Sequence, residues 1–236
     1  LETLLILKIL KNSFILKLFR KRDFITVVFI TVFGAVSITL FYFILTPEKT
    51  LPIYQPYEVN EKLVDSSISY ISKYHKISDF ELINQNGEII TQEYYKNKIY
   101  VADFFFTTCQ SICPIMTKNM LEIQEQLKND KEILLLSHTV TPEIDSVQQL
   151  KKYALENRID DDKWNLVTGE KKQIYDLARK SYLAVEDSEF GNFDMIHTEN
   201  FMLIDKKRQI RGFYDGTDKN EIIRLLSDIE ILKKLD

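Results

Sequence analysis

An uncharged run of 22 residues, from Phe24 to Leu45, most constrains what this chain can fold into. The run contains no proline and a single glycine, Gly34. As an α-helix with a rise of about 1.5 Å per residue it reaches about 33 Å, which is enough to cross the hydrocarbon core of a bilayer. We therefore expect a transmembrane helix over residues 24–45 in place of a buried core helix.

Basic residues gather on the N-terminal side of this run. They are Lys8, Lys11, Lys17, Arg20, Lys21 and Arg22, whereas only Lys49 follows closely on the other side. An excess of lysine and arginine marks the cytoplasmic end of a span, so residues 1–23 are expected to form a cytoplasmic lead-in on the membrane surface. The chain then crosses a bacterial plasma (inner) membrane once, and its remaining residues lie on the periplasmic or outer face.

A cleaved signal peptide is the alternative to an anchor. Its apolar stretch would be about 7–15 residues long and would end in small residues. Here the stretch is longer and ends in the residues Phe41-Tyr42-Phe43-Ile44-Leu45. A retained anchor is therefore favoured.

The residues after the anchor are expected to form a tether and one domain. Three of the five prolines follow the anchor closely, at positions 47, 52 and 56. We expect a tether over residues 46–76, with some helix around residues 67–74, and a single domain over residues 77–236. The net charge of -4, without a basic patch, gives no indication of nucleic-acid binding, and the acidic triplet 160–162 is expected to be solvated surface.

The order of strands and helices in residues 77–236 indicates the fold. Asn86-Gly87 is a hairpin turn signal, and the continuous apolar run 99–106 is expected to be a buried central strand. Strands are expected at residues 80–84, 88–91, 99–106, 132–136, 164–167, 201–204 and 210–214, and helices at 115–127, 145–157, 170–182 and 219–232. This order implies a parallel pair of strands joined to an antiparallel pair, which is typical of an α/β thioredoxin-like fold with helices flanking a central mixed sheet.

The two cysteines of the chain, Cys109 and Cys113, lie where the first central strand passes into its helix. Pro114 suits the first turn of that helix. A helix N-terminus stabilises a thiolate and lowers the pKa of a thiol placed there. An oxidising compartment permits a disulfide, but a bridge that closes so small a loop adds little stability. A metal-binding or redox role is therefore favoured over a purely structural one.

Three histidines could complete a metal site. His75, at the end of the expected tether, is expected to be solvated, and His138 to be a hydrogen-bonded loop residue. His197 precedes the hairpin 201–214 that pairs beside the central strand, so it can face the cysteines. Two thiolates and one imidazole form a soft site that favours copper over magnesium, calcium or manganese. Structural zinc would want a fourth protein ligand, and none is obvious.

A missing proline supports the role of His197. Thioredoxin-like reductases resemble each other in having a cis-proline just before that hairpin, packed against the cysteines. No proline follows Pro142 in this sequence, and His197 occupies the neighbourhood instead. A metal ligand thus stands where a residue that shields sulfur is otherwise found.

The combination resembles the Sco/SenC family of membrane-anchored copper proteins for cytochrome c oxidase assembly. The resemblance runs from about Asp79 to Asp228. Its motifs are Asp79-Phe80, Asn84-Gln85-Asn86-Gly87, the phrase from Phe104 to Pro114, Thr141-Pro142-Glu143 with Asp145, and His197-Thr198 leading to Phe201-Met202-Leu203-Ile204-Asp205. The resemblance implies that Cys109, Cys113 and His197 bind copper, as Cu(I) or Cu(II). It also implies service to the dinuclear copper centre of oxidase subunit II, with other copper chaperones or thiol reductants as further partners.

One departure from the family concerns the loop after the second central strand. Family members often carry Asp-Pro and an Arg-Asp pair there, whereas this chain has Thr141-Pro142 and Ile144-Asp145. One charged pair is lost, which puts a role of those side chains in partner docking in doubt. The three ligand positions are intact.

Two functions of different class follow from these residues. The first is a copper metallochaperone, which binds the metal and passes it on without turnover. The second is a thiol–disulfide oxidoreductase, in which Cys109 and Cys113 are a catalytic redox pair that reduces cysteines of a partner. A peroxidase is less favoured, because peroxiredoxins have threonine where this chain has Phe106. A structural module is the remaining alternative.

Overall fold

The computed structural model describes residues 21–45, 49–59, 64–184 and 198–235, and it divides the chain into two compact units, Leu1–Lys49 and Thr50–Asp236. The described part of the first unit contains the helix α3 (Lys21–Leu45). Within it, Phe24–Leu45 is long and apolar enough to cross a membrane, and its apolar side chains are exposed rather than buried by protein. The helix is therefore suited to be a membrane anchor or a signal. The expected lead-in lies, up to residue 20, outside the described residues.

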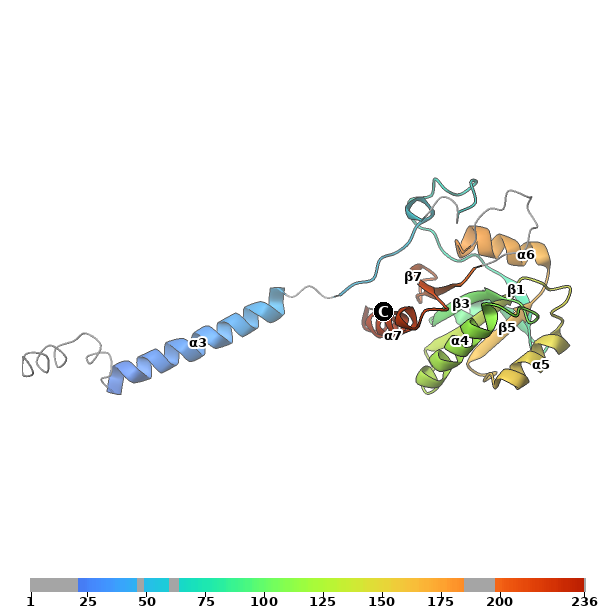
Figure 1. Ribbon diagram of the computed structural model, residues 1–236. Coiled ribbons are helices and arrows are strands. Elements are labelled where there is room, and N and C mark those ends of the chain that lie inside the picture. The colour runs from blue at the N-terminus through green and yellow to red at the C-terminus, as the bar shows by residue number, and fades with distance from the viewer. Residues whose placement is uncertain (1–20, 46–48, 60–63, 185–197, 236) are drawn as a thin grey trace, which may run out of the picture. The chain divides into compact units, whose positions relative to one another are not determined.

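The second unit is built on a seven-stranded mixed sheet (Figure 1). Its strands run in the spatial order β2-β1-β5-β4-β3-β6-β7. Their bounds are β1 (Glu81–Asn84), β2 (Ile89–Thr91), β3 (Ile99–Phe105), β4 (Ile133–Thr139), β5 (Trp164–Thr168), β6 (Asn200–Ile204) and β7 (Ile210–Asp215). The predicted thioredoxin-like fold is confirmed. The predicted parallel pair is in fact three parallel strands, because β5 also pairs parallel with β4. On the two sides of these strands, β1 pairs antiparallel with β5 and β6 pairs antiparallel with β3.

Helices cover both faces of this sheet (Figure 1). They are α4 (Cys113–Leu127), α5 (Val147–Asn157), α6 (Lys171–Asp176), continued by the π-helical turn η4 (Leu177–Ser181), and α7 (Lys219–Leu235); the 3-10 turns η1 (Pro56–Glu58) and η3 (Gln92–Tyr95) lie in the loops. Apolar side chains of α4, α5 and α7 pack on one face, and those of α6 and η4 on the other. The predicted helix 170–182 is thus α-helical only as far as Asp176 and ends in a π-helical turn.

Central strand β3 is apolar apart from Asp103 because both of its faces are buried. Ile99, Val101 and Phe105 face α4, whereas the alternate residues Tyr100 and Ala102 face the opposite core. All seven residues of β3 are buried, and so are all seven of β4. This two-sided burial explains why a largely apolar run predicted the strand, which ends at Phe105.

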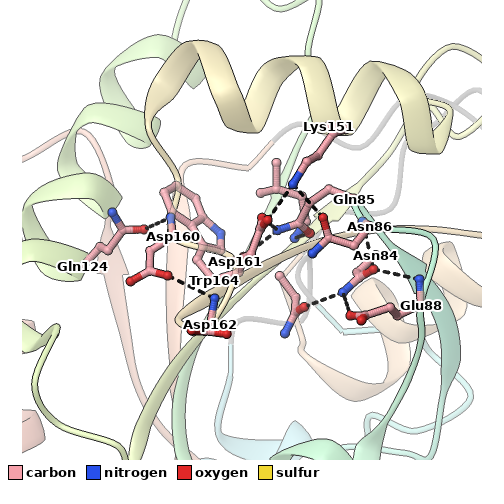
Figure 2. Close-up of polar contacts among 12 residues, drawn as sticks. Asn84, Gln85, Asn86, Glu88, Gln124, Lys151, Asp160, Asp161, Asp162 and Trp164 are labelled. Atoms are coloured by element: carbon pink, nitrogen blue, oxygen red, sulfur yellow. Dashed lines mark hydrogen bonds and ion pairs between the residues drawn. The ribbon is translucent and has the colours of Figure 1, made fainter.

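The hairpin of β1 and β2 is held to the body of the domain by a polar network (Figure 2). Its turn contains Gly87, whose φ of 79° suits glycine. Gln85 donates to the Asp161 carboxylate (2.8 Å) and to the Trp164 carbonyl (2.9 Å), and Lys151 reaches Asp161 at 2.5 Å. The expectation that the acidic triplet 160–162 is solvated surface was therefore only partly correct, because Asp161 anchors this turn.

The described residues between 50 and 76 pack on the sheet domain, which corrects the predicted tether. The backbone N–H of Tyr54 donates to the Ile210 carbonyl (2.9 Å), and Leu51 is buried. Turns, not a helix, occupy the described positions around 67–74. His75 is buried, with Nε2 2.8 Å from the Ser181 carbonyl, so the expectation that it is solvated was wrong. Contacts with residues far along the chain decide this placement.

Candidate metal centre

The two cysteines lie at the corner between β3 and α4. β3 ends at Phe105, and α4 begins at Cys113 with Pro114 in its first turn. Cys109 lies in the intervening loop, where its backbone N–H donates to the Phe106 carbonyl (3.3 Å). Both thiols are free; Cys109 is partly exposed and Cys113 is buried. The sequence prediction of their place in the fold is confirmed.

The surroundings of Cys109 favour its thiolate. Burial is the largest single influence and raises the pKa of Cys109, but hydrogen bonds to its sulfur together outweigh burial. They come from the thiol and backbone N–H of Cys113 and from the backbone N–H and hydroxyl of Ser111, and the pKa falls from 9.0 to about 7. A thiolate at neutral pH is both the nucleophilic and the metal-binding form of cysteine.

Cys113 behaves in the opposite way. Burial, followed by the hydrogen bond shared with Cys109, raises the pKa of Cys113 to about 12. The pair therefore consists of an accessible thiolate and a buried thiol that donates to it. Such a pair can close into a disulfide, and after loss of the second proton it offers two soft sulfur ligands.

A buried acid, Asp103, lies on β3, the strand that leads to the cysteine loop, and was not singled out from the sequence. Its carboxylate accepts a hydrogen bond from the Ser137 hydroxyl, and Ser137 in turn accepts one from Trp164 Nε1 (2.8 Å). Burial raises the pKa of Asp103 to about 7. An aspartate inside the otherwise apolar run 99–106, in step with the residues that face α4, was the available signal.

His138 is a core residue of β4 rather than a loop residue, so that expectation was wrong. It is fully buried, its ring stacks on Phe104 with centroids 4.9 Å apart, and its Nδ1 lies 3.3 Å from the Asp103 carbonyl. Burial lowers the pKa of His138 to about 4. β4 extends this far because its parallel register with β3 continues to the pair Phe105 and Thr139.

The predicted third ligand, His197, lies outside the described residues. In the described part of the chain no group of three or more His, Cys, Asp or Glu side chains is arranged to hold a metal ion. The described chain resumes at Thr198, which is buried, and enters β6 at Asn200. Because β6 is antiparallel to β3, it begins at the end of the sheet where β3 ends. The two sulfur donors fit a soft metal such as copper.

Fold and site define a class: a thioredoxin-like domain whose two free cysteines lie in the loop after the central strand and at the start of the helix that follows it. The model of the SCO1/SenC family matches residues 69–232. This chain belongs to the SCO1/SenC family, whose Sco members are involved in cytochrome c oxidase assembly.

Relatives and solved structures agree with this assignment. The SCO1 protein homolog of Bacillus subtilis (strain 168) is 31% identical over 158 residues, covering 66% of this chain and 82% of the relative. A SCO1/SenC family lipoprotein from Bacillus anthracis str. Ames has a TM-score of 0.60 at 30% identity, covering 67% of this chain and 95% of its own.

Two further structures concern the sulfur and metal chemistry of relatives. BsSco, a member of the Sco family of cytochrome c oxidase assembly proteins reported with a disulfide switch, has a TM-score of 0.59 at 30% identity and covers 69% of this chain and 95% of its own. Arabidopsis thaliana ScoI with copper bound has a TM-score of 0.51 at 22% identity, covering 65% of this chain and 97% of its own, and so shows the shared fold.

Proposed function

We propose that this protein is a membrane-anchored copper metallochaperone for the dinuclear copper centre of cytochrome c oxidase. The observation that carries the proposal is the free Cys109–Cys113 pair at the strand-to-helix corner, in a chain of the SCO1/SenC family. Cys109 is partly exposed and has a lowered pKa, so one soft ligand is ready near neutral pH and is accessible to incoming metal. The copper ion is cargo that the two sulfurs hold and release.

His197 is the proposed third ligand. The antiparallel pairing of β6 with β3 supports this assignment, because it brings the chain entering β6 to the end of the sheet where β3 ends. Two thiolates and one neutral imidazole are a suitable trigonal set for Cu(I). Neither of the other histidines is suited to the role, since His75 and His138 are buried in hydrogen-bonded or stacked positions elsewhere.

The partner and the compartment are part of the same proposal. Oxidase subunit II is the proposed recipient, and the domain is proposed to lie on the periplasmic or outer face of a bacterial plasma membrane. The apolar helix Phe24–Leu45 supports a single anchor with a cytoplasmic N-terminus, because the basic residues precede it.

A thiol–disulfide oxidoreductase that reduces cysteines of a partner is the second candidate. It is favoured by the division of labour between the two sulfurs: Cys109 is the more accessible and more acidic thiol, and Cys113 is buried beside it as the resolving thiol. In this reaction the partner disulfide gains two electrons and two protons, while the Cys109–Cys113 dithiol loses them as its own disulfide forms.

Copper titration tests the metal site. Residues 46–236 are purified without oxygen and titrated with Cu(I), and one copper per domain is expected. Cys113→Ser and His197→Ala should each weaken binding at least 10–100-fold, the cost typical of disturbing even the groups around a ligand, whereas the matched imidazole control His75→Gln should bind as the parent does. Oxidised protein should take up essentially no copper until it is reduced. Binding that is unaffected by Cys113→Ser would exclude this site.

A cellular comparison separates the two functions. His197→Ala removes a proposed ligand but keeps both thiols and the hydrogen bonds that stabilise the Cys109 thiolate. The metallochaperone proposal expects this variant to lose oxidase assembly while its disulfide still forms and exchanges in vitro. If assembly survives in His197→Ala but fails in Cys109→Ser, the oxidoreductase replaces the metallochaperone as the function.

A further inference from the structure

A buried carboxylate lies under the loop that carries Cys109. Asp145 is fully buried, in the segment that joins β4 to α5. Four donors surround it: the backbone N–H of Thr107 (3.2 Å), the hydroxyl of Thr107 (2.5 Å), the hydroxyl of Thr141 (3.1 Å) and the hydroxyl of Thr139. Among the described residues no lysine or arginine forms an ion pair with it. Neutral donors alone therefore satisfy this carboxylate.

These donors belong to two segments that are distant in sequence. Thr139 and Thr141 lie at the end of β4 and just beyond it, within six residues of Asp145. Thr107 lies 38 residues earlier, in the loop between β3 and α4, and only one residue separates it from Cys109. Asp145 therefore ties the cysteine loop to the end of the neighbouring strand.

Thr107 is also contacted by a residue of α5, the helix that follows Asp145. Gln149, in the first turn of α5, donates from Nε2 to the hydroxyl oxygen of Thr107 (3.0 Å). The Thr107 hydroxyl thus accepts from one residue and donates to another, and its backbone N–H is also occupied. A residue bonded at three points has little freedom, and the position of its neighbour Cys109 is restricted with it.

We infer that Asp145 is a positioning residue for the Cys109–Cys113 pair. By holding Thr107, it fixes the start of the loop that carries Cys109, in which the Ser111 hydroxyl lies 3.6 Å from the sulfur of Cys109. Thiol–disulfide equilibria depend on how well each redox state fits the surrounding geometry. This inference deepens the proposed function and rests on the cysteine pair being its working site, whichever of the two chemistries operates there.

The test measures the redox equilibrium of the cysteine pair without copper and without a partner. The full chain in detergent micelles is equilibrated with glutathione buffers. In this exchange the two protein thiols lose two electrons and two protons, and one glutathione disulfide becomes two glutathione thiols. Trapped thiols are counted by mass spectrometry. Failure of the copper titration would leave this result intact, so the two proposals fail independently.

Three variants and one control are compared. Asp145→Ala is expected to shift the thiol–disulfide equilibrium constant by at least tenfold. Asp145→Asn retains one acceptor oxygen and should give a smaller shift in the same direction, as should Thr107→Val, which removes one hydroxyl and little volume. The control is Asp205→Asn, another buried carboxylate, which accepts from the backbone N–H groups of Lys207 and Gln209 and from Arg211 at the β6–β7 turn.

The control separates positioning from general stability. Asp205→Asn should lower the thermal midpoint yet leave the equilibrium constant within twofold of the parent. The inference is wrong if Asp145→Ala and Thr107→Val also stay within twofold, or if their shifts match that of Asp205→Asn. If Asp145→Ala does not fold, Thr107→Val and Asp145→Asn decide the result by the same limit.

Discussion

Asp103 and Ser137 stand opposite one another on the adjacent parallel strands β3 and β4, and the Ser137 hydroxyl donates to the Asp103 carboxylate inside the core. Trp164, on the third parallel strand, donates from Nε1 to Ser137 (2.8 Å). A short chain of polar side chains thus crosses three strands of the sheet. Because burial raises the pKa of Asp103 to about 7, this chain makes the stability of the domain depend on pH.

The first prediction concerns Asp103→Asn. Between pH 4 and 7 the folded state retains a proton on Asp103 that the unfolded state, with the ordinary pKa of 3.8, has lost. The free energy of unfolding should therefore fall as pH rises through this range, by up to about 4 kcal/mol for a pKa difference of about three units. In Asp103→Asn this part of the decrease should disappear. Urea unfolding at several pH values measures it, and parallel curves for parent and variant would contradict the assignment.

The second prediction concerns selective alkylation of the thiols. Iodoacetamide should modify Cys109 well before Cys113, with a rate that rises through a midpoint near pH 7, because the pKa of Cys109 is about 7 and that of Cys113 about 12. In Cys113→Ala the thiol that donates to Cys109 is removed, so the midpoint should move to higher pH. Peptide mass spectrometry identifies the modified residue. Preferential labelling of Cys113 would refute the described division between the two sulfurs.

The third prediction concerns the clamp that Arg211 forms on the start of the domain. Its guanidinium pairs with buried Asp205 (3.0 Å) and donates to the carbonyls of Leu51 and Pro52 (2.8 Å each). Arg211→Ala leaves a buried carboxylate without its cation and should cost about 3–5 kcal/mol of unfolding free energy. It should also speed proteolysis of residues 50–59, because their clamp is lost.

A surface ion pair serves as the control for Arg211→Ala. Lys206 pairs at 3.0 Å with Glu132, whose side chain is exposed whereas that of Asp205 is buried. Lys206→Ala should therefore cost less than about 1 kcal/mol of unfolding free energy. Chemical unfolding and limited proteolysis are measured on both variants. Equal losses in the two would show that Arg211 does not clamp this segment.

The fourth prediction concerns topology. If the helix Phe24–Leu45 is a retained anchor with its basic flank in the cytoplasm, an alkaline phosphatase fused after Asp236 should be active outside the membrane, and a reporter active only in the cytoplasm should be silent. Reducing the positive charge before the helix, by replacing Lys17, Arg20 and Arg22 with glutamine, should weaken this preference. Strong cytoplasmic reporter activity in the parent chain would reverse the proposed orientation.

Local patterns in the sequence were sufficient for much of the fold. The turn at Asn86-Gly87, the largely apolar run 99–106 and the proline in the first turn of α4 are each patterns of residues that lie close together in the sequence. The same holds for the apolar helix and for the place of Cys109 and Cys113 at the end of β3. Short-range conformational preference and hydrophobic periodicity encode these features, so they can be predicted without knowledge of the tertiary contacts.

Other features depended on residues far apart in the chain. The imidazole of buried His75 contacts the Ser181 carbonyl, and Leu51 packs in the hydrophobic core while Arg211 holds its carbonyl. The tether that proline content predicted is therefore mostly part of the domain. His138 belongs to the core because the register of β3 and β4 extends past it, and no pattern within β4 indicates where that register stops.

The site shows the same division. Sequence alone determined the membrane-type helix, the thioredoxin-like order of elements and the cysteine pair, because each is a property of a contiguous segment. Only the tertiary structure decided that Cys109 is the thiolate and Cys113 the thiol, and that Asp145 holds Thr107 from 38 residues away. Burial and hydrogen bonding set these properties, and both are created when distant segments meet in the folded chain.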